Sequence, residues 1–185
     1  MRKKQKTEKV TQEKDNEEKT HFVNTDAVDA ALFSKAFRKG PSAEPAMLLP
    51  VDGVVRINTD VFSDPETGKV VAVFKKGDFD SGAFRDVLTL SEEWFEFTIP
   101  TFEQMSSYRQ RSSNNPQRTP DRNFIRNLLI IYHLSAWSIK DNKVPVPVEK
   151  EVDDSLSKDT VRYVNRIPVV VWDVVLTSLE REILI

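Results

Sequence analysis

Apolar and polar residues alternate most clearly over residues 94–99. Phe95 and Phe97 fall on one side of an extended backbone, and the residues between them fall on the other. This period of two predicts a strand with one buried face. Leu88 and Leu90 precede this strand, and we expect them to belong to a separate strand that forms a hairpin with it.

Two further strands are predicted nearer the N-terminus. Residues 54–57 and 70–74 are short valine-rich runs, and valine favours extended structure. Between them Pro65 fixes its own φ angle and Gly68 tolerates a positive φ, so residues 64–69 predict a tight turn. We therefore expect the two runs to form a hairpin.

Residues 101–185 follow a helical period instead. Thr101 and Gln104 have the spacing of a capping box, in which each side chain accepts a hydrogen bond from the other residue's backbone amide. This spacing predicts a short helix after Thr101. The residues expected on its buried side are Phe102, Met105 and Tyr108.

The longest helix is expected to open at Thr119-Pro120, because proline suits the first helical position, and to run to about Lys140. Its predicted apolar stripe comprises Phe124, Ile125, Leu128, Leu129, Tyr132 and Ala136. Residues 144–148 (VPVPV) must be extended, since each proline disfavours the helical region at the residue before it. A polar helix is expected over about residues 154–164.

Two patterns compete in the last segment. Residues 168–176 contain a valine run that is typical of a strand, whereas the apolar residues from Trp172 to Ile183 recur at helical intervals. Pro168 is compatible with the first turn of a helix. The sequence therefore favours a helix here.

The N-terminal segment has a different composition. Residues 1–20 contain twelve charged side chains, and only Met1 and Val10 are apolar, so the segment cannot bury enough surface to offset the entropy of ordering it. We expect residues 1–23 to be a disordered charged tail, and the sequence leaves open whether it orders on a partner. Residues 24–50 predict a short helix followed by a Pro/Ala-rich linker.

These elements predict an α+β protein. A small antiparallel β section at about residues 51–99 precedes a helical section at about residues 101–185, and residues 51–185 are expected to form a single domain.

Composition excludes several kinds of chemistry. The chain has no cysteine, which excludes disulfides, thiolate nucleophiles and iron–sulfur clusters. It has two histidines, His21 and His133, too few for a His-rich metal site. No apolar stretch approaches the roughly 20 residues of a membrane span. We expect a cytoplasmic protein (in the host cytoplasm if it is viral) that is not an enzyme and uses no cofactor.

Two segments resemble catalytic or nucleotide-binding features. Thr67-Gly68-Lys69 matches the end of a phosphate-binding loop, but the positions that require a glycine and a hydroxyl are Ser63 and Val70, so these residues predict a turn. His133 has no acidic or nucleophilic partner at a spacing that would mark it as a general base.

Basic residues gather between Arg109 and Arg126. The members of this arginine cluster are Arg109, Arg111, Arg118, Arg122 and Arg126, with Tyr108 and Phe124 nearby. Basic side chains interleaved with aromatic ones bind single-stranded nucleic acid in other proteins. The cluster is local, however, and the chain's net charge of −2 gives no general attraction to nucleic acid. Two alternatives to nucleic-acid binding remain. The arginines pair with carboxylates of the same chain, or they form a partner-binding patch, for which Arg111, Arg118 and Arg122 are the candidates.

Two apolar segments are candidates for protein contacts. Trp172, Val175 and Leu179 share one helix face, which belongs either to the core or to a surface for a partner or for further copies of the chain. Residues 144–148 either connect two helices or offer an extended edge to a partner's strand.

Three stretches carry a family resemblance. They are Leu88-Thr89-Leu90 leading into Phe95-Glu96-Phe97-Thr98-Ile99-Pro100, the helix at 101–111, and Asn165-Arg166-Ile167-Pro168 followed by Trp172 and Leu176-Thr177-Ser178-Leu179-Glu180. In layout the chain resembles, over about residues 70–185, the tail assembly chaperones of tailed bacteriophages. The resemblance implies a small cytoplasmic protein that holds the tape measure protein while tail subunits polymerise, through binding without catalysis.

Three classes of function therefore follow from the sequence. The first is a non-enzymatic protein-binding or assembly protein, with the tape measure protein or tail proteins as the expected partners. The second is a nucleic-acid-associated viral or bacterial accessory protein that uses the arginine cluster. The third is an enzyme whose carboxylates meet only in the fold, which would require a pocket with at least two ionisable groups of shifted pKa.

Overall fold

The computed structural model describes residues 21–23, 53–78, 84–113 and 120–183. A five-stranded antiparallel sheet with the order β1-β3-β2-β4-β5 is followed by helices, so the α+β prediction is confirmed. The strands of this sheet are β1 (His21–Val23), β2 (Val54–Ser63), β3 (Val70–Lys75), β4 (Thr89–Thr98) and β5 (Leu134–Trp137). The helices are α2 (Phe102–Ser112), α3 (Arg122–His133), α4 (Lys158–Val164) and α5 (Val169–Ile183).

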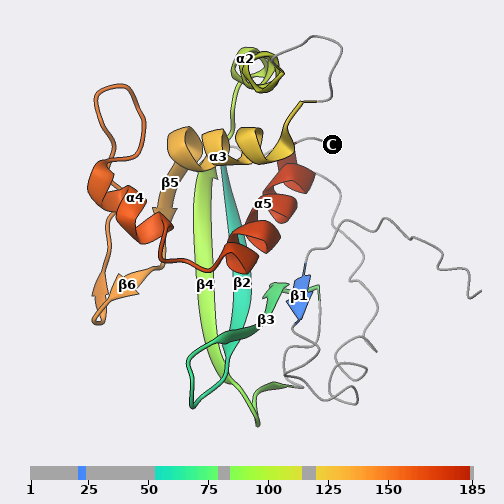
Figure 1. The fold of residues 1–185 in the computed structure, drawn as a ribbon, viewed down its shortest axis with the longest axis vertical. Coiled ribbons are helices and arrows are strands. Elements are labelled where there is room, and N and C mark those ends of the chain that lie inside the picture. Colours follow the sequence, from blue (N-terminus) through green and yellow to red (C-terminus); the bar gives the residue numbers. More distant parts are fainter. Residues whose placement is uncertain (1–20, 24–52, 79–83, 114–119, 184–185) are drawn as a thin grey trace, which may run out of the picture.

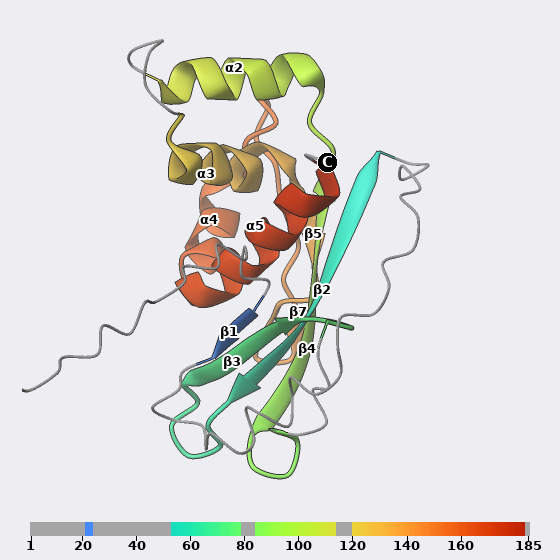
Figure 2. The same cartoon turned by 90° about the vertical axis from the view of Figure 1, so that its right-hand side faces the viewer.

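The helices gather on one face and towards one end of the sheet (Figure 1). Helix α5 lies across β1, β2 and β3. Helix α2 lies across α3, on the side away from the sheet (Figure 2). The main core forms between the inner face of the sheet and these helices.

Strands β2 and β3 form the predicted hairpin. In the turn, the carboxylate of Asp64 accepts hydrogen bonds from the backbone amides of Glu66 and Thr67, both at 2.8 Å. Gly68 has a φ of +67°, which favours glycine. Thr67-Gly68-Lys69 therefore belongs to a hairpin turn, as its residue types predict.

Strand β4 is longer than predicted. It pairs with β2 from Thr89 to Thr98 without interruption, so the expectation that Leu88 and Leu90 form a separate hairpin partner is wrong. Leu90 belongs to β4 itself and lies opposite Phe62 of β2. It packs on the outer face of the sheet, against a second apolar cluster of Phe62, Ala72, Phe74 and Phe84.

Helix α2 has the predicted capping box. The amide of Thr101 donates to Gln104 Oε1 at 2.8 Å, and the amide of Gln104 donates to Thr101 Oγ1 at 3.2 Å. Met105 and Tyr108 are buried as expected, but Phe102 is 88% exposed. The prediction for Phe102 is wrong because α2 rests on α3 through a narrow stripe, and the first helical residue lies beside that stripe.

Helix α3 ends at His133, not at Lys140 as predicted. Residues 134–137 form β5 and pair with the edge of β4. The edge of β4 offers backbone hydrogen bonds to these residues, and such tertiary contacts override the weak helical preference of a short segment. Asp121 caps α3 by accepting hydrogen bonds from the backbone amides of Asn123 and Phe124. Among the helices that the structure describes, α5 is the longest.

The C-terminal predictions are confirmed in outline. Residues 169–183 form a helix, and α4 lies within the predicted polar helix but begins only after the Ser157 cap. The extended Val144–Pro145 segment is β7, which pairs with β6 (Lys140–Asp141) of the same chain.

The N-terminal expectation requires one correction. His21–Val23 was assigned to the disordered tail, whereas these residues form β1 and pair with β3. A three-residue strand has too little sequence pattern of its own to reveal it, because its stability comes from the sheet that it joins. Residues 1–20 and 24–50 lie outside the described residues.

Candidate functional site

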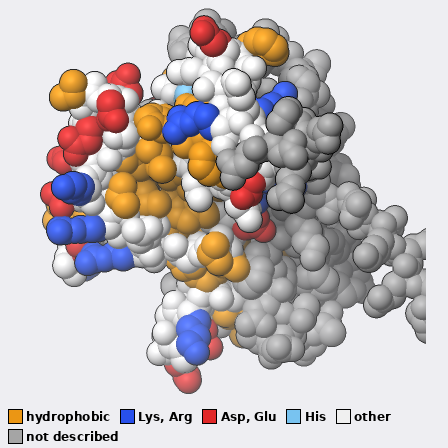
Figure 3. Space-filling view, turned by 45° about the horizontal axis from the view of Figure 1, so that its top comes forward, with side chains coloured by type: hydrophobic (Ala, Val, Ile, Leu, Met, Phe, Trp, Pro, Cys, Tyr) orange, Lys and Arg blue, Asp and Glu red, His pale blue; other side chains and the backbone are white. Residues whose placement is uncertain are grey.

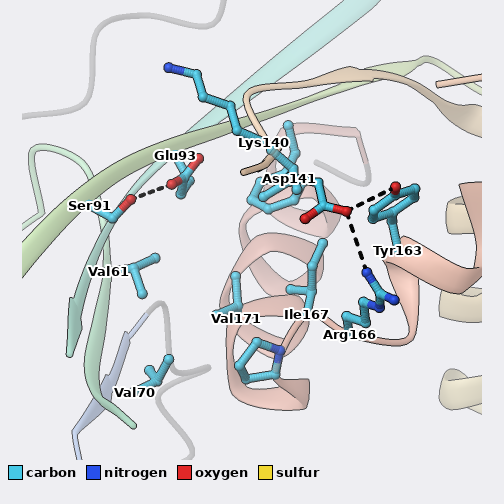
Figure 4. Close-up of a pocket in the computed structure, with 13 residues that line it drawn as sticks. Val61, Val70, Ser91, Glu93, Lys140, Asp141, Tyr163, Arg166, Ile167 and Val171 are labelled. Atoms are coloured by element: carbon cyan, nitrogen blue, oxygen red, sulfur yellow. Dashed lines mark hydrogen bonds and ion pairs between the residues drawn. The ribbon is translucent and has the colours of Figure 1, made fainter. Parts of the chain in front are cut away.

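The turn between α4 and α5 separates two hollows of the surface. The first is a cavity of about 280 Å³ between the sheet and the start of α5, which Figure 4 shows with its lining residues. The second is a groove of about 600 Å³ between α3, the end of α4 and the start of α5. Arg166, Ile167 and Pro168 line both hollows. We call the two hollows and this turn the turn surface.

The walls of the cavity are apolar. Val61 of β2 and Phe95 of β4 contribute from the sheet, and Val171 contributes from α5. These side chains belong to the main core, and Ile139 and Ile167 extend the apolar lining outwards. The cavity is therefore an open end of the core.

A network of polar side chains lies on one side of the cavity. The Tyr163 hydroxyl donates to Asp141 Oδ2 at 3.2 Å, and the Arg166 guanidinium lies 3.7 Å from the same oxygen. Arg166 also lies over the Tyr163 ring, 5.3 Å from its centroid. These contacts orient the guanidinium at the mouth of the cavity (Figure 4).

The opposite side of the cavity carries Glu93. The hydroxyls of Ser91 and Ser138 both donate to its carboxylate. Lys140 extends away from the cavity (Figure 4). The mouth of the cavity thus carries both positive and negative side chains around an apolar interior. Such an arrangement suits a ligand in which an apolar group is flanked by polar groups.

The groove on the other side of the turn has an apolar floor and an amide-rich rim. Its floor includes Ile130, Trp172 and Leu176, and the rim residues with side-chain amides are Asn123, Asn127 and Asn165. Val169 lies at its edge and is 77% exposed. Figure 3 shows hydrophobic side chains gathered on this face beside the charged side chains of α4.

Of the candidate partner-binding residues Trp172, Val175 and Leu179, only Trp172 reaches a hollow of the surface, as part of the groove floor. All three side chains are at most 7% exposed and belong to the main core. Trp172 packs against Phe95 with ring centroids 5.1 Å apart, and its indole nitrogen donates to the Val164 carbonyl at 3.1 Å. Of the two alternatives for these residues, core or partner surface, the structure supports the core, because α5 lies on the sheet.

The members of the arginine cluster have different surroundings in the structure. Arg122 and Arg126 of α3 both donate to the carboxylate of Glu180 on α5. Arg126 also donates to Asp173 at 2.6 Å and to Thr177 at 2.7 Å. Arg111 is exposed on α2, and Arg118 lies outside the described residues. For Arg122 and Arg126 the pairing alternative is the one that the structure supports.

Burial and charge act in opposite directions within this group. Burial opposes ionisation of Arg126, but hydrogen bonds to Glu180 and its negative charge raise the pKa of Arg126 above its ordinary value. Burial likewise opposes ionisation of Glu180, and the two guanidinium groups lower its pKa overall. The group joins α3 to α5 in its charged form.

His133 has partners that sequence spacing did not reveal. The Tyr108 hydroxyl lies 2.9 Å from Nε2, and the Thr98 hydroxyl lies 3.2 Å from Nδ1. Burial, and then the charge of Lys150, lower the pKa of His133. Both ring nitrogens are hydrogen-bonded inside the protein, so His133 links α2, α3 and β4. The partners are 25 and 35 residues distant in sequence, which explains why no local motif marked them.

Within the described residues, no group of three or more His, Cys, Asp or Glu side chains has the geometry to hold a metal ion. No helix in the same part of the chain combines the length and apolar character that crossing a membrane requires. Comparisons with models of protein families, with curated protein sequences and with solved structures find no match for this chain.

Proposed function

We propose that this protein is a non-enzymatic binding protein that acts in the assembly of a larger complex, and that it binds its protein partner through the turn surface. The observation that carries the proposal is the apolar cavity at the open end of the core, with a mouth of mixed charge. This arrangement binds by shape and apolar contact.

The cavity is small enough for a single protein side chain to be its occupant. It measures about 280 Å³, at the lower limit of the roughly 300–1,000 Å³ of pockets for drug-sized ligands. One large apolar side chain fits such a volume, and interface hot spots commonly consist of a bulky anchor in a well-packed pocket. The polar groups at the mouth would then contact the residues on either side of the anchor.

The groove suggests the form of the partner. It lies on the other side of the α4–α5 turn from the cavity and presents an apolar floor with an amide-rich rim. An amphipathic helix places apolar residues three and four positions apart along one face. We infer that the partner is such a helix, with one bulky anchor for the cavity. The resemblance to tail assembly chaperones makes the tape measure protein our first candidate.

The nucleic-acid alternative has less support. Two residues of the arginine cluster, Arg122 and Arg126, are engaged with Glu180, so their charge is partly neutralised and their donors are directed into the protein. A steep loss of single-strand binding with added salt would favour this alternative.

The first test uses the neighbouring gene. The product of a long helical-protein gene directly downstream should co-purify with the tagged full chain. Val169→Asp should weaken this binding about fivefold or more, because loss of a hot-spot contact costs more than about 1 kcal/mol. The substitution lies at the start of α5, where a carboxylate suits the helix dipole, so the fold should be retained.

Val152→Asp is the matched control. Val152 is also exposed but lines neither hollow, so this variant should bind like the wild type. Equal binding by the two variants, or an absence of binding by the wild type, would contradict the proposal.

A further inference from the structure

The face of strand β4 that is turned towards the core carries a carboxylate. Side chains alternate between the two faces of a strand, so Glu93 lies on the same face as Phe95 and Phe97, both of which are fully buried. Glu93 also lines the apolar cavity. A carboxylate on the apolar face of a sheet is unfavourable unless hydrogen-bond donors surround it. The position of Glu93 therefore requires donors.

Two serine hydroxyls meet part of this requirement. Ser91 Oγ donates to Oε1 of Glu93, and Ser138 Oγ donates to Oε2. Each carboxylate oxygen can accept two hydrogen bonds, so among the described residues one acceptor position on each oxygen has no donor. The serines hold the carboxylate in one orientation on the sheet side of the cavity (Figure 4). Glu93 is thus a positioned acceptor with capacity for a further donor.

The burial of the lining residues places this acceptor near the mouth of the cavity. Val61, Phe95 and Val171 are at most 7% exposed, and they form the enclosed part of the lining. Glu93 is only partly buried, so its side chain lies nearer to the solvent. An occupant that matches both features has a hydrogen-bond donor close to its own backbone and an apolar far end.

Tryptophan is the side chain with this arrangement. Its indole N–H belongs to the five-membered ring, next to the backbone, and the six-membered ring beyond it is apolar. Indole nitrogen donates and does not accept, which matches a carboxylate. Tyrosine, lysine and arginine carry their polar groups at the far tip, which would lie against Phe95 and Val171 without a hydrogen-bond partner. Phenylalanine would cover the acceptor positions of Glu93 without supplying a donor.

We propose that the cavity selects a tryptophan of the partner protein, which donates its indole N–H to Glu93 and packs its six-membered ring against Phe95 and Val171. This inference rests on the proposed function and deepens it, because it names the anchor residue. Tryptophan is enriched in interface hot spots, and a buried indole N–H usually has a hydrogen-bond acceptor. Glu93 sets the specificity of the cavity, whereas the apolar walls supply affinity.

Small analogues of side chains test this selection on the full chain. The probes are skatole for tryptophan, N-methylskatole for the same rings without the N–H, para-cresol for tyrosine and toluene for phenylalanine. The backbone amide signals of Phe95 and Val171 in NMR titrations of isotope-labelled protein report binding in the cavity. Skatole should bind about tenfold more tightly than N-methylskatole, because hydrogen bonds to charged groups are among the stronger ones. Para-cresol should bind no more tightly than toluene.

Variants of Glu93 separate the hydrogen bond from the shape of the cavity. In Glu93→Met, which has a side chain of similar length and no strong acceptor, skatole and N-methylskatole should bind about equally. Glu93→Gln keeps a neutral acceptor and should show a smaller preference for skatole than the wild type. Glu92→Gln is the matched control, because Glu92 lies on the opposite face of β4 and pairs with Lys76. The full preference should remain in this control.

Three results would overturn the inference. The first is a preference for skatole that persists in both Glu93 variants, which would mean that the added methyl group is excluded by shape. The second is tighter binding of para-cresol than of skatole, which would place the acceptor at the deep end. The third is equal binding of all four probes, which would leave the proposed function standing. Co-purification with the neighbouring gene product tests that function separately, since it does not depend on which side chain the cavity prefers.

Discussion

Two clusters of ionised side chains lie on either side of α5, and the difference between them is burial. Arg126 and Glu180 are 11% and 9% exposed at the α3–α5 interface. Arg166 and Asp141 are 69% and 44% exposed at the mouth of the cavity. The residue types are similar, but the first pair is enclosed by the fold and the second is open to solvent.

This difference separates a structural role from a binding role. Enclosed charges have strong mutual attraction and a large desolvation cost, so losing one partner leaves an unpaired buried charge. Exposed pairs contribute little to stability because water and salt screen them. Arginine-rich segments therefore cannot be assigned to binding by composition alone. The partners that each guanidinium meets in the fold decide its role.

The same substitution at both sites should give very different losses of stability. Arg126→Ala should lower the free energy of unfolding by about 2–4 kcal/mol, since it leaves the buried Glu180 with Arg122 alone. Urea denaturation followed by circular dichroism measures this loss. An effect below about 1 kcal/mol would show that the group between α3 and α5 is not a structural element.

A second prediction concerns the enclosed histidine. The pKa of His133 is lowered from its ordinary value of 6.5 in the folded protein, so below pH 6.5 the unfolded state binds more protons. Stability from this group is fully present above pH 6.5 and falls as the pH drops towards the lowered pKa, by at most about 1.4 kcal/mol per pH unit.

Urea denaturation between pH 5 and pH 7.5 measures this dependence. His133→Gln should remove it, whereas His21→Gln should retain it, because His21 is the only other histidine. A dependence that survives in His133→Gln would assign it to other groups.

The smallest effect is expected at the mouth of the cavity. Arg166→Ala should change the free energy of unfolding by less than about 0.5 kcal/mol, because its ion pair with Asp141 is exposed. It should nevertheless weaken binding of the partner in the co-purification assay. A large loss of stability would mean that Arg166 serves the fold and would remove the contrast with Arg126.

Some parts of the fold carry their own signal in the sequence. The turn at residues 64–69 follows from Pro65 and Gly68, whose backbone preferences act within a few residues. The cap at Thr101 and Gln104 is equally local. The helix after Pro168 was recognisable because the helical spacing of its apolar residues, from Trp172 to Ile183, extends over about three turns.

Other parts depend on contacts between distant residues. The end of α3 at His133 is set by the edge of β4, which attracts residues 134–137 into the sheet. The partners of His133, the exposure of Phe102 and the cavity at the α4–α5 turn have no counterpart in any short stretch of sequence. The candidate site itself was therefore not predictable, although the Asn165–Pro168 turn that divides it was among the stretches singled out by the family resemblance.

What the sequence by itself determined is thus the local conformations, the α+β order and the exclusion of cysteine chemistry, because backbone preferences and composition act without reference to the rest of the chain. Only the tertiary structure decided which arginines are enclosed, that Trp172, Val175 and Leu179 belong to the core, and where the core remains open. Burial and long-range pairing are properties of the packed chain, since each depends on which surfaces meet.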